Sequence, residues 1–229
     1  MRCVRSLVTA LLLLSLSVCC AVPASAEPEM VYCRPCAREK KLIALTFDDG
    51  PHPRYTPQIL DILAEYDVKA TFFTIGINAE TYPELIRRAR AEGHEIGNHT
   101  YSHYNASKLS DEALQKEIAS CDTVLRHITD TPVRYFRPPE GVCSAAAKRI
   151  CEQYGYTIVM WSVDTRDWAH TPVNDICRNV MKNTKNGSVI LMHDFIGKNS
   201  PTPAALRQII PMLQKSGFTF VTVSQLLEG

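Results

Sequence analysis

Two adjacent acidic residues stand where an apolar run of the chain ends. Asp48 and Asp49 follow the run Leu42–Leu45 closely and precede the step Gly50-Pro51. The run is typical of a buried strand and the Gly-Pro step of its abrupt end, so both carboxylates are expected at the strand tip. Neighbouring like charges repel in a partly dry site unless a cation or another positive partner faces them. A metal ion is the usual partner for such a pair.

Two histidines four residues apart supply further candidate ligands. His99 and His103 have the spacing that places two imidazoles on one face of a helical turn, where they can share an ion. One carboxylate oxygen and two imidazole nitrogens leave a coordination position open, which is the pattern of a catalytic zinc site. A surface helix with two solvated histidines is the competing interpretation. The acidic pair upstream favours the metal site.

An arginine on a proline turn is a third candidate. Arg137 precedes Pro138-Pro139, so a stiff turn presents its guanidinium. A rigid cation near Asp48 would lower the pKa of that carboxylate and orient it. An exposed arginine on a surface proline turn is the ordinary alternative.

Two later segments add an aromatic side chain and a histidine. Trp168 follows Asp164 and Asp167, and it could form a wall against a sugar ring or belong to the core. His193 ends the buried run Ile190–Met192. Alone, this histidine is more typical of a hydrogen-bonded core or rim residue than of a catalyst.

Strand and helix signals alternate along the rest of the chain. The predicted strands are residues 42–45, 68–75, 94–98, 133–137, 156–163, 188–192 and 218–223. The first predicted helix begins at the cap Thr56-Pro57, the second ends near Gly93 and the third begins at the cap Ser110. Three further helices are predicted over residues 145–154, 173–183 and 203–214. About seven strand-helix units predict a parallel sheet with covering helices.

The candidate residues follow different strands of this pattern. Asp48 and Asp49 follow the first predicted strand, His99 and His103 the third, Arg137 the fourth, Asp164 and Asp167 the fifth, and His193 the sixth. In a barrel of parallel strands, loops at the carboxyl ends of the strands carry the chemistry. We therefore expect a closed or nearly closed barrel with one reactive rim. An open doubly wound sheet is the alternative, although no Gly-rich dinucleotide or phosphate loop is present.

The first 26 residues predict a secretory signal. A basic start, Met1–Arg5, precedes the apolar stretch Leu7–Val22 and the cleavage pattern Ala24-Ser25-Ala26. A membrane anchor is disfavoured because the apolar core is short and serines interrupt it. A lipoprotein signal at Cys19 is also disfavoured, because valine precedes the cysteine. The chain is therefore expected to be exported, with no membrane span after cleavage.

Length and charge limit the number of domains and the kinds of partner expected for the mature protein. Removing the first 26 of 229 residues leaves 203, which suits one sizeable domain. Residues 27–40 are predicted to be a polar lead-in and residues 41–229 the catalytic domain. Without Arg2 and Arg5, the balance of 25 basic against 24 acidic residues becomes 23 against 24. This near-neutral charge gives no reason to expect nucleic acid or an anionic membrane as partner.

An even number of cysteines remains after cleavage. They are Cys33, Cys36, Cys121, Cys143, Cys151 and Cys177. An even count in an exported protein permits disulfides, but the sequence does not determine their pairing. No second Cys-x-x-Cys accompanies Cys33 and Cys36, so a bridge or free thiols fit that pair better than a zinc ribbon.

Five motifs in order resemble those of the polysaccharide deacetylases, also called carbohydrate esterase family four or the NodB-homology domain. They are Thr-Phe-Asp-Asp-Gly-Pro-His at 46–52, His-Thr-Tyr-Ser-His at 99–103, Phe-Arg-Pro-Pro-Glu-Gly at 136–141, Asp-Thr-Arg-Asp-Trp at 164–168 and Leu-Met-His at 191–193. Each motif alone is weak. Five in order, over roughly residues 41 to 225, are specific.

The resemblance implies an α/β fold, a distorted (β/α) barrel with about seven parallel strands, and metal-dependent removal of acetyl groups from N-acetylated sugars. It implies a divalent metal, zinc first and cobalt or manganese as alternatives, held by Asp49, His99 and His103. It implies that Asp48 is the general base, that Arg137 holds this base and that His193 is the general acid. It also implies that Leu191 and Trp168 line an acetyl pocket. Asp167 would either tune His193 or pair with Arg137.

Glu140 departs from the pattern that the resemblance implies. The family often has an aromatic residue, usually tyrosine, at this position. A backbone N–H in the Pro139-Glu140 turn can still hold a developing oxyanion together with the metal. The added negative charge leads to the hypothesis that Glu140, as a substrate-binding residue, disfavours anionic sugars such as muramic acid and permits partly deacetylated, cationic glycans.

The leading hypothesis is an exported polysaccharide N-deacetylase. Cell-wall peptidoglycan is the first expected substrate and chitin oligosaccharide the second, and the protein is expected to be a secreted or wall-associated monomer. An O-acetyl esterase acting on xylan and a non-catalytic glycan-binding homologue remain alternatives. Every catalytic position is filled, which disfavours the binding homologue. A plain metal-binding protein would leave Arg137 and His193 without a role.

Overall fold

The computed structural model describes residues 28–34 and 41–228, so the predicted signal segment and Cys36 lie outside the described residues. The strands are β1 (Met30–Val31), β2 (Lys41–Asp48), β3 (Thr71–Thr74), β4 (Glu95–Asn98), β5 (Tyr135–Phe136), β6 (Thr157–Val159), β7 (Val163–Asp164), β8 (Val189–His193) and β9 (Phe218–Val221). The helices are α1 (Tyr55–Glu65), α2 (Gly76–Thr81), α3 (Pro83–Ala91), α4 (Asp111–Thr129), α5 (Ala145–Tyr154), α6 (Val173–Asn183), α7 (Thr202–Lys215) and α8 (Val223–Glu228). Three short 3-10 turns complete the set: η1 (Ala106–Lys108), η2 (Pro139–Gly141) and η3 (Asp167–Ala169).

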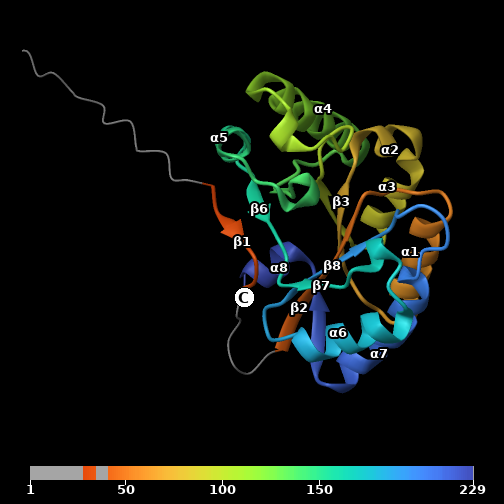
Figure 1. Ribbon diagram of the computed structural model, residues 1–229. Helices are drawn as coiled ribbons and strands as arrows, with labels where there is room; N and C mark the ends of the chain where they lie inside the picture. Colours follow the sequence, from red (N-terminus) through yellow and green to blue (C-terminus); the bar gives the residue numbers. More distant parts are fainter. Residues whose placement is uncertain (1–27, 35–40, 229) are drawn as a thin grey trace, which may run out of the picture.

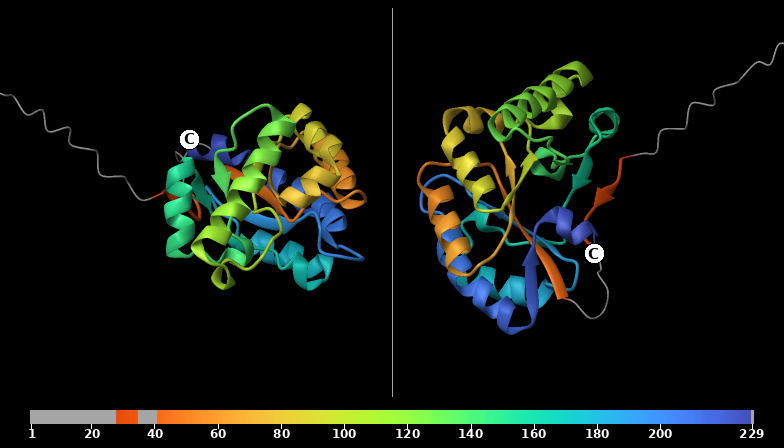
Figure 2. Two further views of the ribbon diagram at one scale, coloured as in Figure 1. Left: turned by 90° about the horizontal axis from the view of Figure 1, so that it is seen from above. Right: turned by 180° about the vertical axis from the view of Figure 1, so that it is seen from behind.

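The strands form one curved parallel sheet with helices on its outer side (Figures 1 and 2). Its order is β1-β6-β5-β4-β3-β2-β8-β7, and β9 pairs with the first half of β2. The path of paired strands ends at β1 and β7, so the described sheet is a distorted, incompletely closed barrel. The predicted fold class is therefore confirmed, with nine strands in place of about seven.

The central strand β2 is buried over almost its whole length because core residues pack against both of its faces. Ile43, Leu45 and Phe47 belong to the main core, into which α1 sends Ile59 and Leu63. Parallel register places the ends of β2 and β8 side by side, with Asp48 opposite His193. The burial of β2 therefore fixes where its terminal carboxylates stand.

Several predicted elements are confirmed closely. The helices α5 and α6 have the predicted bounds, and Ser110 caps α4 by accepting a hydrogen bond from the Ala113 N–H at 3.3 Å. The predicted N-cap at Thr56 is wrong, because α1 begins at Tyr55. The Thr56 hydroxyl instead donates to Asp194 at 2.5 Å and accepts from the His52 N–H at 2.7 Å. It therefore ties α1 to the residue that follows β8.

The strand predicted over residues 156–163 is in fact two strands, β6 and β7. Arg137 accounts for the break between them. Its Nε donates to the carbonyl oxygen of Val159 at 2.9 Å and its Nη2 to that of Met160 at 3.0 Å. A buried side chain therefore satisfies carbonyl groups that a neighbouring strand would otherwise bond.

Three elements were not predicted: β1, α2 and α8. The strand β1 lies within the expected polar lead-in, where it pairs with β6, and Cys33 then forms an isolated bridge with Ser188. The described part of the lead-in, residues 28–34, is therefore joined to the sheet. The described cysteines, Cys33, Cys121, Cys143, Cys151 and Cys177, are free thiols. No described helix has both the length and the apolar composition needed to cross a membrane.

Candidate active site

The predicted site residues gather at the carboxyl end of the sheet. A cavity of about 460 Å³ opens there, a size common for small-molecule sites. Its lining contains Asp48, Asp49, His99, His103, Glu140, Trp168, Leu191 and His193 from the prediction, and Trp161 and Asp164 in addition. The two remaining predicted residues, Arg137 and Asp167, lie fully buried behind this lining.

Arg137 holds Asp48 in one orientation. Its Nη1 donates to Oδ1 of Asp48 at 2.7 Å and to the hydroxyl of Thr46 at 2.9 Å. Burial lowers the pKa of the Arg137 guanidinium, and the Asp48 carboxylate opposes that change. The guanidinium also lies 4.0 Å from the ring centroid of Phe73. The predicted contact between Arg137 and Asp48 is therefore present, in a fully desolvated setting.

Asp49, His99 and His103 present three ligand atoms to one point. These atoms all lie within 4.8 Å of one another. Oδ1 of Asp49 is 3.4 Å from Nε2 of His99 and 3.2 Å from Nε2 of His103. This buried oxygen nevertheless has no hydrogen-bond partner among the described residues. An uncompensated carboxylate oxygen facing two imidazole nitrogens is the donor set of a divalent transition metal site.

The imidazole of His99 is oriented for ligation. Its Nδ1 lies 2.7 Å from the carbonyl oxygen of Arg137, which can only accept, so Nδ1 carries the proton. When the ring is neutral, as a metal ligand must be, Nε2 carries the lone pair on the side that faces Asp49. Burial acts most strongly on the pKa of Asp49 and raises it, but the attraction of His99, His193 and His103 outweighs burial and lowers this pKa.

The predicted helical turn under the histidines is wrong. Residues 99–105 form a loop, in which Thr100 has a φ of 67° and His103 a φ of 59°. Hydrogen bonds fix this loop: the Thr100 N–H donates to Oδ1 of Asn98 at 2.9 Å, and the Ser102 hydroxyl donates to Glu117 at 2.7 Å. The imidazoles are brought together, with centroids 5.0 Å apart, by loop geometry and not by helical spacing.

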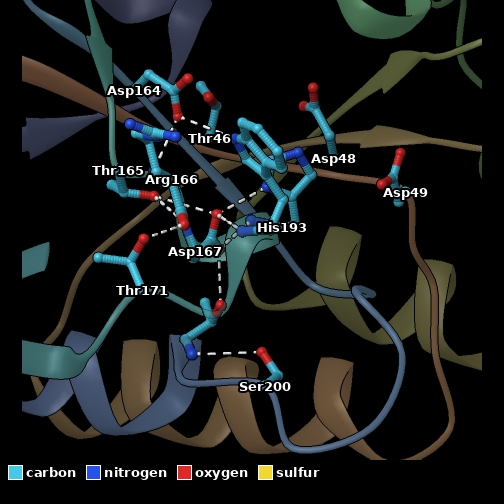
Figure 3. A network of polar contacts seen from close by, with 12 residues as sticks. Thr46, Asp48, Asp49, Asp164, Thr165, Arg166, Asp167, Thr171, His193 and Ser200 are labelled. Atoms are coloured by element: carbon cyan, nitrogen blue, oxygen red, sulfur yellow. Dashed lines mark hydrogen bonds and ion pairs between the residues drawn. The ribbon is translucent and has the colours of Figure 1, made fainter.

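Asp167 pairs with His193 and not with Arg137, which resolves the alternative left open by the sequence. Figure 3 shows Asp167 on one side of His193 and Asp48 and Asp49 on the other. Oδ1 of Asp167 lies 2.8 Å from Nδ1 of His193, and Oδ2 accepts from the His193 backbone N–H at 2.8 Å. Burial lowers the pKa of His193, but Asp167 more than compensates, and the pKa rises to about 9.

The predicted substrate-binding residues surround the cavity mouth. Leu191 is buried in its wall, whereas Trp168 is 49% exposed and donates from Nε1 to Asp164 at 3.3 Å. Glu140 accepts a hydrogen bond from the Asn105 amide at 2.6 Å and has a φ of 56°.

The sequence analysis missed Asp194, whose backbone N–H donates to the carbonyl oxygen of Asp48 at the end of β2. Its carboxyl is buried, and an added Cβ on Gly50 would lie 2.0 Å from its Oδ2. Burial raises the pKa of Asp194 to about 7. Its position two residues after the end of the predicted strand 188–192 was a signal that could have found it, because acids at strand ends mark this rim.

Comparison with known proteins places this fold and site in a family. The model of the family described as polysaccharide deacetylase matches residues 37–159. A peptidoglycan-N-acetylglucosamine deacetylase of Bacillus cereus is 46% identical over 190 residues, covering 82% of this chain and 89% of that protein. A chitooligosaccharide deacetylase of Azorhizobium caulinodans is 39% identical, covering 77% of this chain and 90% of that protein.

A solved structure agrees with these matches. The crystal structure of a peptidoglycan N-acetylglucosamine deacetylase in complex with 4-naphthalen-1-yl-N-oxidanyl-benzamide superimposes with a TM-score of 0.84 at 38% identity. The match covers 88% of this chain and 94% of that one. Fold, motif order and sequence identity thus agree over most of the described residues, and we conclude that the chain belongs to the polysaccharide deacetylase family.

Proposed function

We propose that this polysaccharide N-deacetylase is a metal-dependent enzyme that acts on N-acetylglucosamine residues of peptidoglycan, with chitin oligosaccharide as its second substrate. The observation that carries the proposal is the convergence of Asp49, His99 and His103 beside two oriented pairs, Asp48 with Arg137 and His193 with Asp167. The relatives that the chain resembles act on glycans of this kind, according to their names.

The residues present fit a divalent metal. Oδ1 of Asp49 is buried, negatively charged and without a hydrogen bond among the described residues, while two Nε2 atoms face it. An ion held by these three atoms would keep further coordination positions open, and zinc suits one carboxylate and two imidazoles best. Such an ion supplies Lewis acidity, which lowers the pKa of water and polarises a carbonyl group.

Asp48 can act as the general base. It lines the cavity beside the candidate metal ligands, and its Oδ2 lies 3.8 Å from Nε2 of His99. The bond from Arg137 occupies Oδ1 of Asp48 and leaves Oδ2 turned toward the cavity side. Asp48 can therefore take a proton from an attacking water molecule.

His193 can act as the acid. Its Nδ1 is hydrogen-bonded to Asp167, so Nε2 is the atom that can donate a proton to a substrate in the cavity. A pKa of about 9 keeps the ring protonated at neutral pH, when an amide nitrogen must receive a proton to leave. The Glu140 N–H can hold the oxyanion of the tetrahedral intermediate, and Leu191 and Trp168 can enclose the acetyl group.

An acetate-release panel tests the proposal. Metal-free protein and protein with added zinc, cobalt or manganese are given peptidoglycan, chitin oligomers and acetylated xylan. We expect metal-dependent release that is highest on peptidoglycan and next on chitin oligomers. Faster release from xylan would replace the proposal with an O-acetyl esterase. No release from any glycan in the presence of metal would leave a glycan-binding homologue.

We also propose that the mature protein is secreted or associated with the cell wall, because the first 26 residues carry the pattern of a cleaved signal. Cell fractionation followed by N-terminal sequencing tests this directly. A new N-terminus at residue 27 in the medium or wall fraction supports the proposal. Full-length protein confined to the cytoplasm contradicts it.

A further inference from the structure

The loop that carries two of the candidate metal ligands has a costly backbone conformation. Thr100 has a φ of 67° and His103 a φ of 59°, in the left-handed region that favours glycine. For a β-branched residue such as Thr100 this conformation is a genuine outlier. Strained backbone of this kind persists where surrounding contacts hold it in place. The spacing of His99 and His103 therefore depends on the groups that hold this loop.

Asn98, the last residue of β4, is one of these groups. Its Oδ1 accepts from the Thr100 N–H at 2.9 Å, and its Nδ2 donates to the carbonyl oxygen of Ile118 on α4 at 3.0 Å. A backbone N–H only donates and a carbonyl oxygen only accepts, so these two bonds allow one orientation of the amide. The Thr100 hydroxyl in turn accepts from the His103 N–H at 3.2 Å. One side-chain amide thus sets the backbone between the two ligands.

Tyr156 extends this set of hydrogen bonds away from the catalytic cavity. Its hydroxyl accepts from Nδ2 of Asn98 at 3.1 Å and donates to Oδ1 of Asp122 on α4 at 2.6 Å. Burial raises the pKa of Tyr156, and the hydrogen bond to Asp122 raises it further, so the phenol keeps its proton. Oδ2 of Asp122 accepts from Nε of Arg126 at 2.6 Å. The donors therefore point in one direction, from the loop through Asn98 and Tyr156 to Asp122.

A second side chain of α4 holds the middle of the same loop. Oε2 of Glu117 accepts from the Ser102 N–H at 2.8 Å, and Oε1 accepts from the Ser102 hydroxyl at 2.7 Å. Both oxygens of this carboxylate are thus used on one residue of the loop. Because Thr100 and Ser102 both lie between the two histidines, α4 supports the loop at two points.

We infer that Tyr156 and Glu117 are positioning residues that hold His99 and His103 at the spacing a metal ion requires. The inference rests on the proposed function, of which the metal is a part. Neither side chain lines the catalytic cavity or supplies a ligand atom, so each acts through the loop. Their removal should weaken metal binding while the three ligand atoms stay present, because outer hydrogen bonds orient ligands and raise metal affinity.

Zinc affinity of Tyr156→Phe gives the first test. The change removes one hydroxyl and keeps the ring in the core. We expect the Kd for zinc, measured by competition with a chelator, to rise about ten-fold, with one zinc still bound per chain. Thr71→Val is the matched control. It removes another buried hydroxyl, which donates to Glu95 at 3.0 Å from the first residue of β3, and it should keep the wild-type Kd.

Glu117→Ala gives a second test that does not disturb the buried network around Tyr156. It removes both acceptors of Ser102, and we again expect the Kd for zinc to rise about ten-fold. Glu112→Ala, at an exposed position of the same helix, is its control and should keep the wild-type Kd. The visible absorption spectrum of the cobalt-loaded protein reports coordination geometry. It should change in Tyr156→Phe and Glu117→Ala and stay the same in both controls.

The outcomes separate this inference from the proposed function. A wild-type protein that binds no zinc overturns the proposed function. If the wild type binds zinc, an unchanged Kd and cobalt spectrum in Tyr156→Phe or in Glu117→Ala overturns the inference for that residue alone. An equal rise of the Kd in Thr71→Val also overturns it, because general destabilisation would then explain the loss. Urea unfolding of each metal-free variant supplies the stability for this comparison.

Discussion

Oδ1 of Asp167 lies 2.8 Å from Nδ1 of His193, and both oxygens of this fully buried carboxylate are occupied by donors. Oδ2 accepts from the His193 N–H at 2.8 Å and from the hydroxyl of Thr202 at 2.7 Å. The carboxylate therefore fixes both the tautomer and the direction of the imidazole. The acid of the proposed reaction is prepared by a residue that does not touch the cavity.

The first prediction concerns Asp167→Asn and the alkaline limit of activity. The pKa of His193 is raised to about 9, so the acid is present below that pH and activity falls as the pH rises through it. Without the carboxylate of Asp167, only Asp48 and Asp49 oppose burial, so the pKa of the ring falls. We expect the alkaline limb of kcat to move to lower pH by at least about one unit, so that activity at pH 8 falls by about two-fold or more. Asp175→Asn on α6 is the control.

The pH profile distinguishes this role from a structural one. A uniform loss of activity at every pH, with an unmoved alkaline limb, would argue against Asp167 as the group that sets the His193 pKa. An unshifted His193 signal in an NMR titration of the variant would argue the same.

The second prediction concerns the buried ion pair. Arg137→Met leaves the Asp48 carboxylate buried without its cation, which should lower the free energy of unfolding by about 3–5 kcal/mol. Arg137→Lys keeps the charge but cannot donate to Asp48, Val159 and Met160 together, so an intermediate loss is expected. Urea unfolding measures both. Equal stability of the methionine variant and the wild type would contradict this account.

The third prediction concerns Gly50. A Cβ there would lie 2.0 Å from Oδ2 of Asp194, so Gly50→Ala must displace a buried carboxyl under the strand end. We expect a loss of about 1–3 kcal/mol in the free energy of unfolding. Asp194→Ala makes room, so the double variant should lose less than the two single losses added together. Strict additivity would mean that the two residues do not crowd each other.

The fourth prediction concerns Glu140 and the charge of the glycan. Glu140→Gln keeps an acceptor for Asn105 and removes a negative charge from the cavity lining. We expect the preference for partly deacetylated over fully acetylated oligomers to fall about two- to five-fold, and the discrimination against anionic oligomers to weaken. Asp67→Asn is the matched control, since Asp67 is highly exposed and has a φ of 51° that asparagine tolerates. An unchanged substrate ranking would remove the hypothesis.

Sequence reasoning reached the site because its residues follow the ends of strands. Parallel register then brings Asp48 opposite His193, although 145 positions separate them in the chain. The prediction from sequence failed where a side chain far away in the chain determines the local structure. Arg137 divides the strand predicted over 156–163, and nothing near residue 160 announces that carbonyl groups there will bond a guanidinium.

Loop conformation was the other limit. The sequence placed His99 and His103 together for the wrong reason, because hydrogen bonds donated to Asn98 and to Glu117 on α4 shape their loop. The sequence likewise could not choose between two partners for Asp167, since both His193 and Arg137 follow strand ends on the same side of the sheet. Asp194 was missed because its role depends on contact with Gly50, far away in sequence.

Zinc content and acetate release, measured together on Asp48→Asn and His99→Ala, test the central claim most directly. The account predicts that Asp48→Asn binds one equivalent of zinc and loses turnover, because the ligand atoms belong to Asp49, His99 and His103. His99→Ala should lose both zinc and turnover. Full acetate release by Asp48→Asn, or by protein stripped of metal, would contradict the account.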